Sequence, residues 1–322
     1  MPQPTVGSVH IDQAMTNMSL AYIQTQSDFI ALDVFPTVPV DKQTNKYYKY
    51  TKNDWFRDEA TVRADTDESA GSGYNVDNAG YTCDVFAIHK DIGSQIRSNA
   101  DPAIDLEREA TLWVTQRMLL RQEIQWTTDY FATSIWGTDL TPANLWSDYT
   151  LSDPIGDIRT AIRTIFINTG LKPNKLALGY DTFIKLVDHP DIVDRVKYGG
   201  SMGMPAMVNQ EVLAKLFGLE QVLVCGAVKA TNDEGASAVM AFVQGKHALL
   251  LHVAAAPGLL TPSAGYIFAW VGVSRGLGKN VAITRIPMPW RGRETVRVEG
   301  EIAFDDVVVA TDLGYFFNGA VA

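Results

Sequence analysis

The chain has 322 residues, and its 27 Lys and Arg residues are outnumbered by 37 Asp and Glu residues, which gives a formal net charge of −10. Hydrophobic residues make up 46% of the chain, so its composition is that of a globular protein and excludes collagen-like, disulfide-rich and disordered classes. The acidic balance argues against a protein that binds nucleic acid by neutralising phosphates, and the length allows one large or two modest domains.

Cysteine usage and the absence of targeting patterns favour a reducing compartment. Cys83 and Cys225 lie far apart and form no Cys-x-x-Cys pair. The first twenty residues are polar and lack the apolar centre of a signal peptide. No segment approaches the roughly 18 apolar residues that a membrane-spanning helix requires. We therefore expect a protein made in a cytosol, with no membrane partner.

The N-terminal segment, residues 1–45, is predicted to be an extended arm. Pro36 and Pro39 each restrict φ, remove a backbone donor and bias the preceding residue toward extended geometry. Such a segment would add little to the core of an isolated subunit, so we expect something else to cover it.

Residues 46–92 are predicted to form a long β-hairpin. Aromatic and polar side chains alternate over residues 46–56, and a second strand is expected over residues 80–92. The intervening residues 57–79 are rich in Asp, Ser, Gly and Asn, with six acidic residues against two basic ones. A loop this long in a compact domain is either functional or disordered.

A long helix is predicted to follow the hairpin. Asp101 is a suitable N-cap, Pro102 suits the first helical position, and the apolar periodicity continues to about Trp136, before Gly137. At 1.5 Å per residue this helix would be a rod of roughly 50 Å, which suggests the spine of a domain.

Residues 151–285 alternate helical and strand patterns and indicate an α/β segment. A helix should end at Gly170, and the remaining predicted helices are residues 181–188 and 209–217. Predicted strands are residues 175–180, 221–228, 238–243, 248–254 and 266–273. The C-terminal part is predicted to contain two strands joined by a turn at Asp305 and Asp306.

No catalytic, cofactor-binding or metal-binding site is predicted. Residues 275–280 (RGLGKN) resemble a phosphate-binding loop only loosely, because five residues separate Gly272 from Gly278 and no hydroxyl residue follows the lysine. Cys83 and His89 are six residues apart on one predicted strand, too far to act as nucleophile and base. The histidines are scattered and complete no zinc site: His10, His89, His189, His247 and His252.

Two segments of opposite charge are the candidate contact sites. The hairpin tip carries Asp65, Asp67 and Glu68, and the basic residues of the later segment 275–297 include Arg285, Arg291 and Arg293. Opposite charges on two separate segments suit contacts between copies of one protein, where they steer and register subunits. The alternative is that both segments are ordinary solvated loops.

The order of these parts resembles the major capsid proteins of tailed double-stranded DNA bacteriophages, which have the Hong Kong 97-type shell fold. Four stretches also look similar to such proteins in sequence: residues 171–199, 211–228, 256–270 and 305–321. The resemblance implies an α+β fold with five parts along the chain. These are an N-terminal arm (1–45), an E-loop hairpin (46–92), a peripheral domain with the spine helix (93–150), an axial domain (151–285), and C-terminal strands returning to the peripheral domain (286–322).

The resemblance implies a structural role without enzymatic activity. Copies would assemble as pentamers and hexamers into an icosahedral phage head, made in the host bacterial cytoplasm, that encloses DNA without sequence-specific binding. Implied partners are other copies, a portal and possibly a decoration protein. The chain starts almost at the arm, so we expect a scaffolding protein that is separate or already cleaved off. The alternative is a phage tail-tube or other ring-forming protein, although such proteins are usually smaller and lack so long a helix.

Some relatives join an E-loop lysine to a neighbouring asparagine, but we expect no such covalent crosslink here. Lys42, Lys46, Lys49 and Lys52 lie on or before the first hairpin strand, and the tip between Arg57 and Ala79 contains no lysine. Purified particles boiled in denaturant should therefore run as a single band at the 35.4 kDa monomer. A ladder of larger bands on that gel would contradict the prediction.

Overall fold

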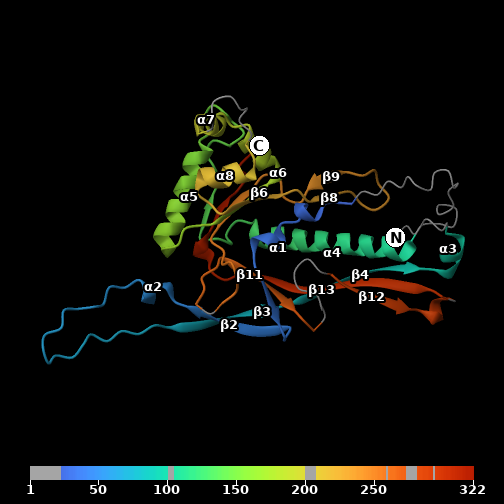
Figure 1. The fold of residues 1–322 in the computed structure, drawn as a ribbon, viewed down its shortest axis with the longest axis horizontal. Helices are drawn as coiled ribbons and strands as arrows, with labels where there is room; N and C mark the ends of the chain where they lie inside the picture. The colour runs from blue at the N-terminus through green and yellow to red at the C-terminus, as the bar shows by residue number, and fades with distance from the viewer. Residues whose placement is uncertain (1–22, 101–104, 200–207, 259, 273–280, 293) are drawn as a thin grey trace.

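The computed structural model describes residues 23–100, 105–199, 208–258, 260–272, 281–292 and 294–322, and these residues include two five-stranded sheets (Figure 1). The strands of the peripheral sheet are β1 (Thr37–Val40), β4 (Asp84–Ile92), β11 (Gly265–Trp270), β12 (Ala282–Pro287) and β13 (Val296–Val308). Those of the axial sheet are β5 (Thr138–Leu140), β6 (Lys175–Gly179), β7 (Gln221–Cys225), β10 (Ala248–Leu251) and β14 (Gly314–Phe317). The predicted α+β class is confirmed.

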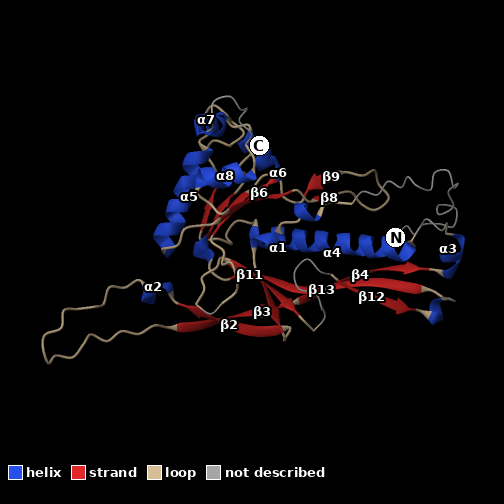
Figure 2. Cartoon of the chain, viewed as in Figure 1, coloured by secondary structure: helices blue, strands red, loops and turns tan. Residues whose placement is uncertain are grey.

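The spine helix α4 (Leu106–Tyr130) lies along the peripheral sheet and packs on β4 and β13 (Figure 2). Its N-cap is Asp105, whose carboxylate accepts a hydrogen bond from Arg108 N at 3.1 Å. The predicted cap at Asp101 and the following proline lie outside the described residues. The 25 residues of α4 span about 37 Å, shorter than the rod expected from the sequence.

The helix ends at Tyr130 rather than Trp136, and a side chain explains the difference. The chain turns back after Tyr130, and Trp136 Nε1 donates a hydrogen bond to the Tyr130 carbonyl at 2.8 Å. The bond satisfies a C-terminal carbonyl that has no partner within the helix. Both aromatic rings are buried, so core packing sets the end of the helix and overrides the local periodicity.

Strand β13 organises the peripheral sheet. Its residues Val296–Glu301 pair with β12 on one edge and with β4 on the other, and its C-terminal part pairs with β11. The predicted turn at Asp305 and Asp306 is therefore wrong: both residues lie within the strand, paired with Phe268 and Ile267. Long-range pairing with β11 keeps this stretch extended despite two residues that are rare in strands. Strand β12 was not predicted.

The hairpin is shorter than predicted, because its second strand divides at Cys83. Strand β2 (Thr44–Tyr50) pairs with β3 (Val76–Thr82), whereas β4 leaves the hairpin and joins β13. At the division Cys83 is fully buried and its N–H donates to the Gln43 carbonyl at 2.9 Å. The first strand continues into the short helix α2 (Lys52–Trp55), and residues 55–78 are all exposed. Figure 1 shows this loop extending well away from the two sheets.

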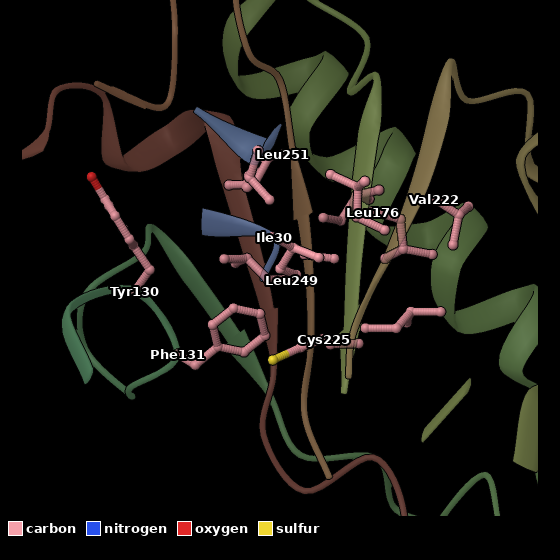
Figure 3. Close-up of a cluster of buried hydrophobic side chains, with 14 of the residues drawn as sticks. Ile30, Tyr130, Phe131, Leu176, Val222, Cys225, Leu249 and Leu251 are labelled. Atoms are coloured by element: carbon pink, nitrogen blue, oxygen red, sulfur yellow. The ribbon is translucent and has the colours of Figure 1, made fainter. Parts of the chain in front are cut away.

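The described part of the N-terminal segment is packed in the core, which corrects the expectation that it adds little to the subunit. Phe29, Ile30, Val34 and Phe35 are each at most 4% exposed. Residues Ala31–Val34 form the short helix α1, and β1 then pairs with β11 in parallel. Figure 3 shows Ile30 beside leucines of the axial sheet.

Two side chains hold the two ends of α1. The buried Glu123 carboxylate on α4 accepts hydrogen bonds from Ile30 N (3.2 Å) and Ala31 N (2.9 Å). Lys175 Nζ donates to the carbonyls of Asp33 (2.6 Å) and Val34 (2.8 Å) at the other end. The two side chains thereby satisfy backbone groups at both ends of a helix of only four residues, while burial raises the pKa of Glu123 above its ordinary value. These two contacts, which we call the α1 clamp, attach the segment to α4 and to the axial sheet.

Helices surround the axial sheet, and local signals explain most of their ends. Helix α5 (Pro154–Thr169) is capped by Asp153 and ends at Gly170, whose φ of 71° suits glycine. Helix α8 (Gln210–Phe217) is capped by Asn209 and ends at Gly218. The remaining elements of this part are α6 (Tyr180–Val187), α7 (Pro190–Gly199), β8 (Val228–Ala230) and β9 (Met240–Phe242). The prediction missed α7 and placed β7 and β8 in one strand.

Three strands belong to a different sheet from the one that the sequence ranges suggest. Strand β11 and the first four residues of β12 lie within residues 151–285, but both strands pair in the peripheral sheet. Strand β14 lies within residues 286–322 but pairs with β10 and β5 in the axial sheet. The chain therefore crosses between the sheets more often than the linear order of segments implies.

The α1 clamp predicts that Glu123→Ala lowers the free energy of unfolding of the unassembled subunit by about 3 kcal/mol, because two buried backbone N–H groups lose a charged acceptor. Glu123→Gln keeps one acceptor oxygen and should lose less. Urea denaturation measures both values. Thr128→Ala, an exposed change on the same helix, is the control and should stay within about 0.5 kcal/mol of the unsubstituted chain. An equally small effect of Glu123→Ala would show that the clamp contributes little.

Candidate assembly surfaces

The described residues offer little for catalysis or metal binding. Within them, no cluster of three or more His, Cys, Asp or Glu side chains could hold a metal ion. No helix in the described ranges is long and apolar enough to cross a membrane. Cys83 and Cys225 are both free and buried, and burial raises the pKa of the Cys83 thiol to about 11. A thiol of this kind is a poor nucleophile at neutral pH.

One constellation that sequence reasoning missed is a buried pair, Ser152 and His189, with the exposed Asp191 beside it. His189 Nε2 lies 3.0 Å from Ser152 Oγ, and His189 Nδ1 lies 3.9 Å from an Asp191 carboxylate oxygen. The Asp191 N–H donates to His189 Nδ1 at 3.3 Å, which leaves the ring proton on Nε2. Ser152 Oγ in turn donates to the Asp148 carbonyl at 2.6 Å. The proton directions are therefore opposite to those of a serine nucleophile activated by histidine.

This group joins the turn before α5 to the junction of α6 and α7. His189 is fully buried, and burial lowers its pKa, with the nearby Asp191 and Asp153 opposing the shift. Tyr149 packs edge-on against the imidazole ring. A neutral imidazole that connects two segments through hydrogen bonds is a structural element.

The hairpin tip lies free of the rest of the subunit, while its base is attached. Lys52 Nζ lies 2.5 Å from an Asp312 carboxylate oxygen, and the Phe56 ring packs against Gly170 at the end of α5. Beyond this base, Asp65, Asp67 and Glu68 are exposed. The rings of Tyr50, Trp55 and Tyr74 pack together with centroid distances of 5.6–6.3 Å, and Trp55 and Tyr74 remain more than half exposed.

The predicted basic residues lie in ion pairs within their own subunit. Arg285 forms two hydrogen bonds to Glu107, both at 3.1 Å. Arg291 contacts Asp91 at 2.9 Å, and Arg297 contacts the same carboxylate at 2.8 Å. The hydrogen bond from Arg297 lowers the pKa of Asp91 below its ordinary value. Arg293 lies outside the described residues.

These pairs leave much of the basic surface accessible. The side chains of Arg285 and Arg291 are 56% and 58% exposed, so each can still face a second carboxylate. The tip and the basic residues are not brought together within one chain. Figure 1 shows why: the hairpin loop extends from one end of the molecule, and β12 lies toward the other.

A buried carboxyl group on β13 was also missed by sequence reasoning. Both carboxylate oxygens of Asp306 are inaccessible to solvent and accept no hydrogen bond from the described residues. Burial, followed by the neighbouring Asp129 and Asp305 carboxylates, raises the pKa of Asp306 well above its ordinary value of 3.8. Asp305 beside it accepts a hydrogen bond from Thr82 N at 2.8 Å. The Asp-Asp pair, which suggested a turn, instead lies under α4 and the hairpin base.

Comparison with known proteins identifies relatives of this architecture. No family model matches the chain. The major capsid protein of Burkholderia phage BcepMu is 26% identical over 247 residues, covering 72% of this chain and 76% of that protein. The major capsid protein of Pseudomonas phage JBD67 is 27% identical over 317 residues, covering 97% of each.

Solved structures share the same fold. A phage-related protein from Bordetella bronchiseptica RB50 has a TM-score of 0.68 and 20% identity, with 92% of this chain and 94% of that chain covered. The capsid structure of Cyanophage P-SCSP1u has a TM-score of 0.62 and 9% identity, with 94% and 90% covered. The Hong Kong 97-type capsid fold and the resemblance predicted from the sequence are confirmed.

The buried Asp306 carboxyl predicts a pH-dependent stability. A carboxyl whose pKa is raised by folding stabilises the subunit only at low pH, and this contribution is lost as pH rises above the unfolded value of 3.8. Asp306→Asn keeps the shape without the charge, so it should raise the free energy of unfolding by about 1–3 kcal/mol at pH 7.

Urea denaturation at neutral pH and near pH 4 measures this effect. The gain from Asp306→Asn should shrink at the lower pH, where the native carboxyl is already neutral. Asp58→Asn in the exposed loop is the control and should change nothing. A gain that is equal at both pH values would exclude ionisation of Asp306 as its cause.

Proposed function

We propose that this chain is a structural major capsid protein, whose copies assemble as pentamers and hexamers into an icosahedral phage head around double-stranded DNA. The observation that carries the proposal is the combination of the capsid fold with a long exposed hairpin loop. Two major capsid proteins match most of the chain at 26% and 27% identity.

The physical argument rests on the exposed loop. Residues 55–78 bury almost nothing within the subunit, yet Trp55, Phe56 and Tyr74 present large aromatic surfaces to solvent. A single copy gains little that offsets the entropy of ordering such a loop. A neighbouring copy that covers the loop supplies the missing burial, so assembly explains why the loop is retained.

We further propose that the acidic tip of one subunit contacts the basic end of the next. The hairpin loop that carries the acidic tip leaves one end of the molecule, while β12, which contains Arg285, lies toward the other (Figure 1). A contact between two different surfaces at opposite ends is head-to-tail, and repeating it closes a ring when the rotation permits. The exposed ion pairs at Arg285 and Arg291 can exchange partners at low cost.

The remaining parts of the proposal follow from the shell role. A scaffolding protein, a portal and possibly a decoration protein would be its partners, and the protein would be made in the host bacterial cytoplasm and reside in the virion shell. The enclosed DNA would be held without sequence-specific contacts, consistent with the net charge of −10. No enzymatic activity is proposed. Ser152 Oγ donates its proton to the Asp148 carbonyl, and His189 does not accept it, so the pair is not arranged as a nucleophile and its base.

Electron microscopy of the purified full chain in negative stain tests the function. Polyhedral shells are expected. Tubes would favour the alternative of a tail-tube or other ring-forming protein, and dispersed particles under all assembly conditions would contradict self-assembly.

Charge reversal tests the contact between the tip and the basic end. Asp65→Lys, Asp67→Lys and Glu68→Lys together should reduce the assembled fraction about tenfold, because like charges would then face one another. The loop is exposed, so the unassembled subunit should unfold at the same urea concentration as before. Asp58→Lys, near the base of the same loop, is the matched control and should assemble normally.

The complementary reversal is Arg291→Glu with Arg293→Glu. Arg297 still pairs with Asp91 when Arg291 is replaced, so the subunit should remain folded. This variant alone should also assemble poorly, and combining it with the reversed tip should recover particles. Normal, heat-stable particles from either reversal alone would show that these segments do not meet.

A further inference from the structure

Helix α5 has an exposed face that its own subunit does not use. Its opposite face buries Ile155, Ile158 and Ile165 against the axial sheet. The exposed face carries Arg159, Arg163, Phe166 and Ile167, which we call the α5 face. Phe166 is 44% exposed and Ile167 is 63% exposed, so apolar side chains lie where a solvated helix would have polar ones.

The charges of the α5 face are available for a partner. Within the described residues, neither Arg159 nor Arg163 takes part in an ion pair or a side-chain hydrogen bond, and the two are four residues apart on one side of the helix. Lys172 adds a third positive charge, with its ammonium 5.6 Å from the Phe166 ring centroid. Apolar centres bordered by arginine are typical of protein–protein interfaces.

The opposite side of the axial sheet carries a complementary surface. It comprises the exposed residues Tyr180, Ile184, Asp233, Glu234, Val239 and Met240, which we call the β8–β9 face. The Tyr180 ring stacks on Phe242 of β9 with a centroid distance of 4.6 Å, which joins α6 and the β8–β9 hairpin into one surface.

The charge of the β8–β9 face is opposite to that of the α5 face. The two acids lie at the tip of the hairpin, where Ala236 N donates to the Asp233 carbonyl and closes the turn. Residues 231–245 contain no Lys or Arg. The tip of the β8–β9 hairpin therefore places two acids beside exposed apolar side chains, while the basic residues Lys229 of β8 and Lys185 of α6 lie outside the tip.

The two faces lie on opposite sides of the axial sheet. In Figure 1, α5 forms the left margin of this part of the molecule, and α6, β8 and β9 lie on the right. They cannot meet within one chain. Two different, complementary surfaces on opposite sides are the requirement for a head-to-tail contact between identical subunits.

We propose that the α5 face of one subunit binds the β8–β9 face of a second copy of this chain, with Arg159 and Arg163 opposite Asp233 and Glu234, and with Phe166 and Ile167 on Val239 and Met240. This inference rests on the proposed shell function and specifies a contact that would close its rings. The hairpin loop leaves the molecule on the same side as α5 (Figure 1), so one neighbour would receive both.

Charge reversal and its rescue test the contact in the purified full chain. Arg159→Glu with Arg163→Glu should lower the assembled fraction about tenfold, and so should Asp233→Arg with Glu234→Arg. All four changes together should recover most of the particles. Arg159→Lys with Arg163→Lys is the matched control, since it keeps the charge and should assemble normally.

The outcomes separate this inference from the function on which it rests. If the unsubstituted chain forms shells and the reversed α5 face assembles equally well, the contact is wrong and the shell function stands. Loss of assembly in both reversals without recovery in the combined variant would also overturn the pairing. If the reversed α5 face impairs assembly only when a second phage protein is coexpressed, this face binds that protein and the proposed contact between copies is wrong. If the unsubstituted chain never assembles, the proposed function itself fails.

Discussion

One continuous hydrophobic core joins the two sheets, and the buried carboxyl group of Glu123 is the polar contact at its centre that attaches α1 to α4. It accepts two backbone hydrogen bonds at the start of α1, while Lys175 donates to two carbonyls at the end of the same helix. Gln24 extends this attachment, since its side chain both donates to and accepts from the Val228 backbone. The described residues 24–40 thereby contact α4, the axial sheet and, through β1, the peripheral sheet, and most of residues 29–35 pack in the core.

The hairpin loop, in contrast to α1, is not attached to the core. Its base is fixed by Lys52 and Phe56, but the loop beyond them makes almost no contact with its own subunit. This arrangement suits the proposed assembly, in which a neighbouring copy would cover the exposed loop and supply burial that one subunit lacks. At the basic end, Arg285 and Arg291 pair with Glu107 and Asp91 of their own subunit but remain more than half exposed, which suits the proposed contact with the acidic tip of another copy.

Sequence signals predicted helix ends reliably where residues adjacent in the chain determine where a helix begins and ends. Asp153 and Gly170 define the ends of α5, and Asn209 and Gly218 define those of α8, because capping hydrogen bonds and left-handed turns involve residues close in sequence. The order of parts and the local likenesses were sufficient to predict the capsid fold. The acidic tip was visible as composition, but the α5 and β8–β9 faces were not, since exposure on opposite sides of a sheet has no signature in sequence.

The sequence by itself determined α5, α6 and α8 of the axial part, the presence of a hairpin with a long loop, and the resemblance to capsid proteins, because each depends on short-range patterns and chain order. Tertiary structure alone decided that most of residues 29–35 are buried, that β13 continues through Asp305 and Asp306, and that β3 and β4 separate at Cys83. In each case the deciding contact joins residues far apart in the chain. A buried side chain or a paired strand edge then outweighs the local preference for a turn or an extended arm.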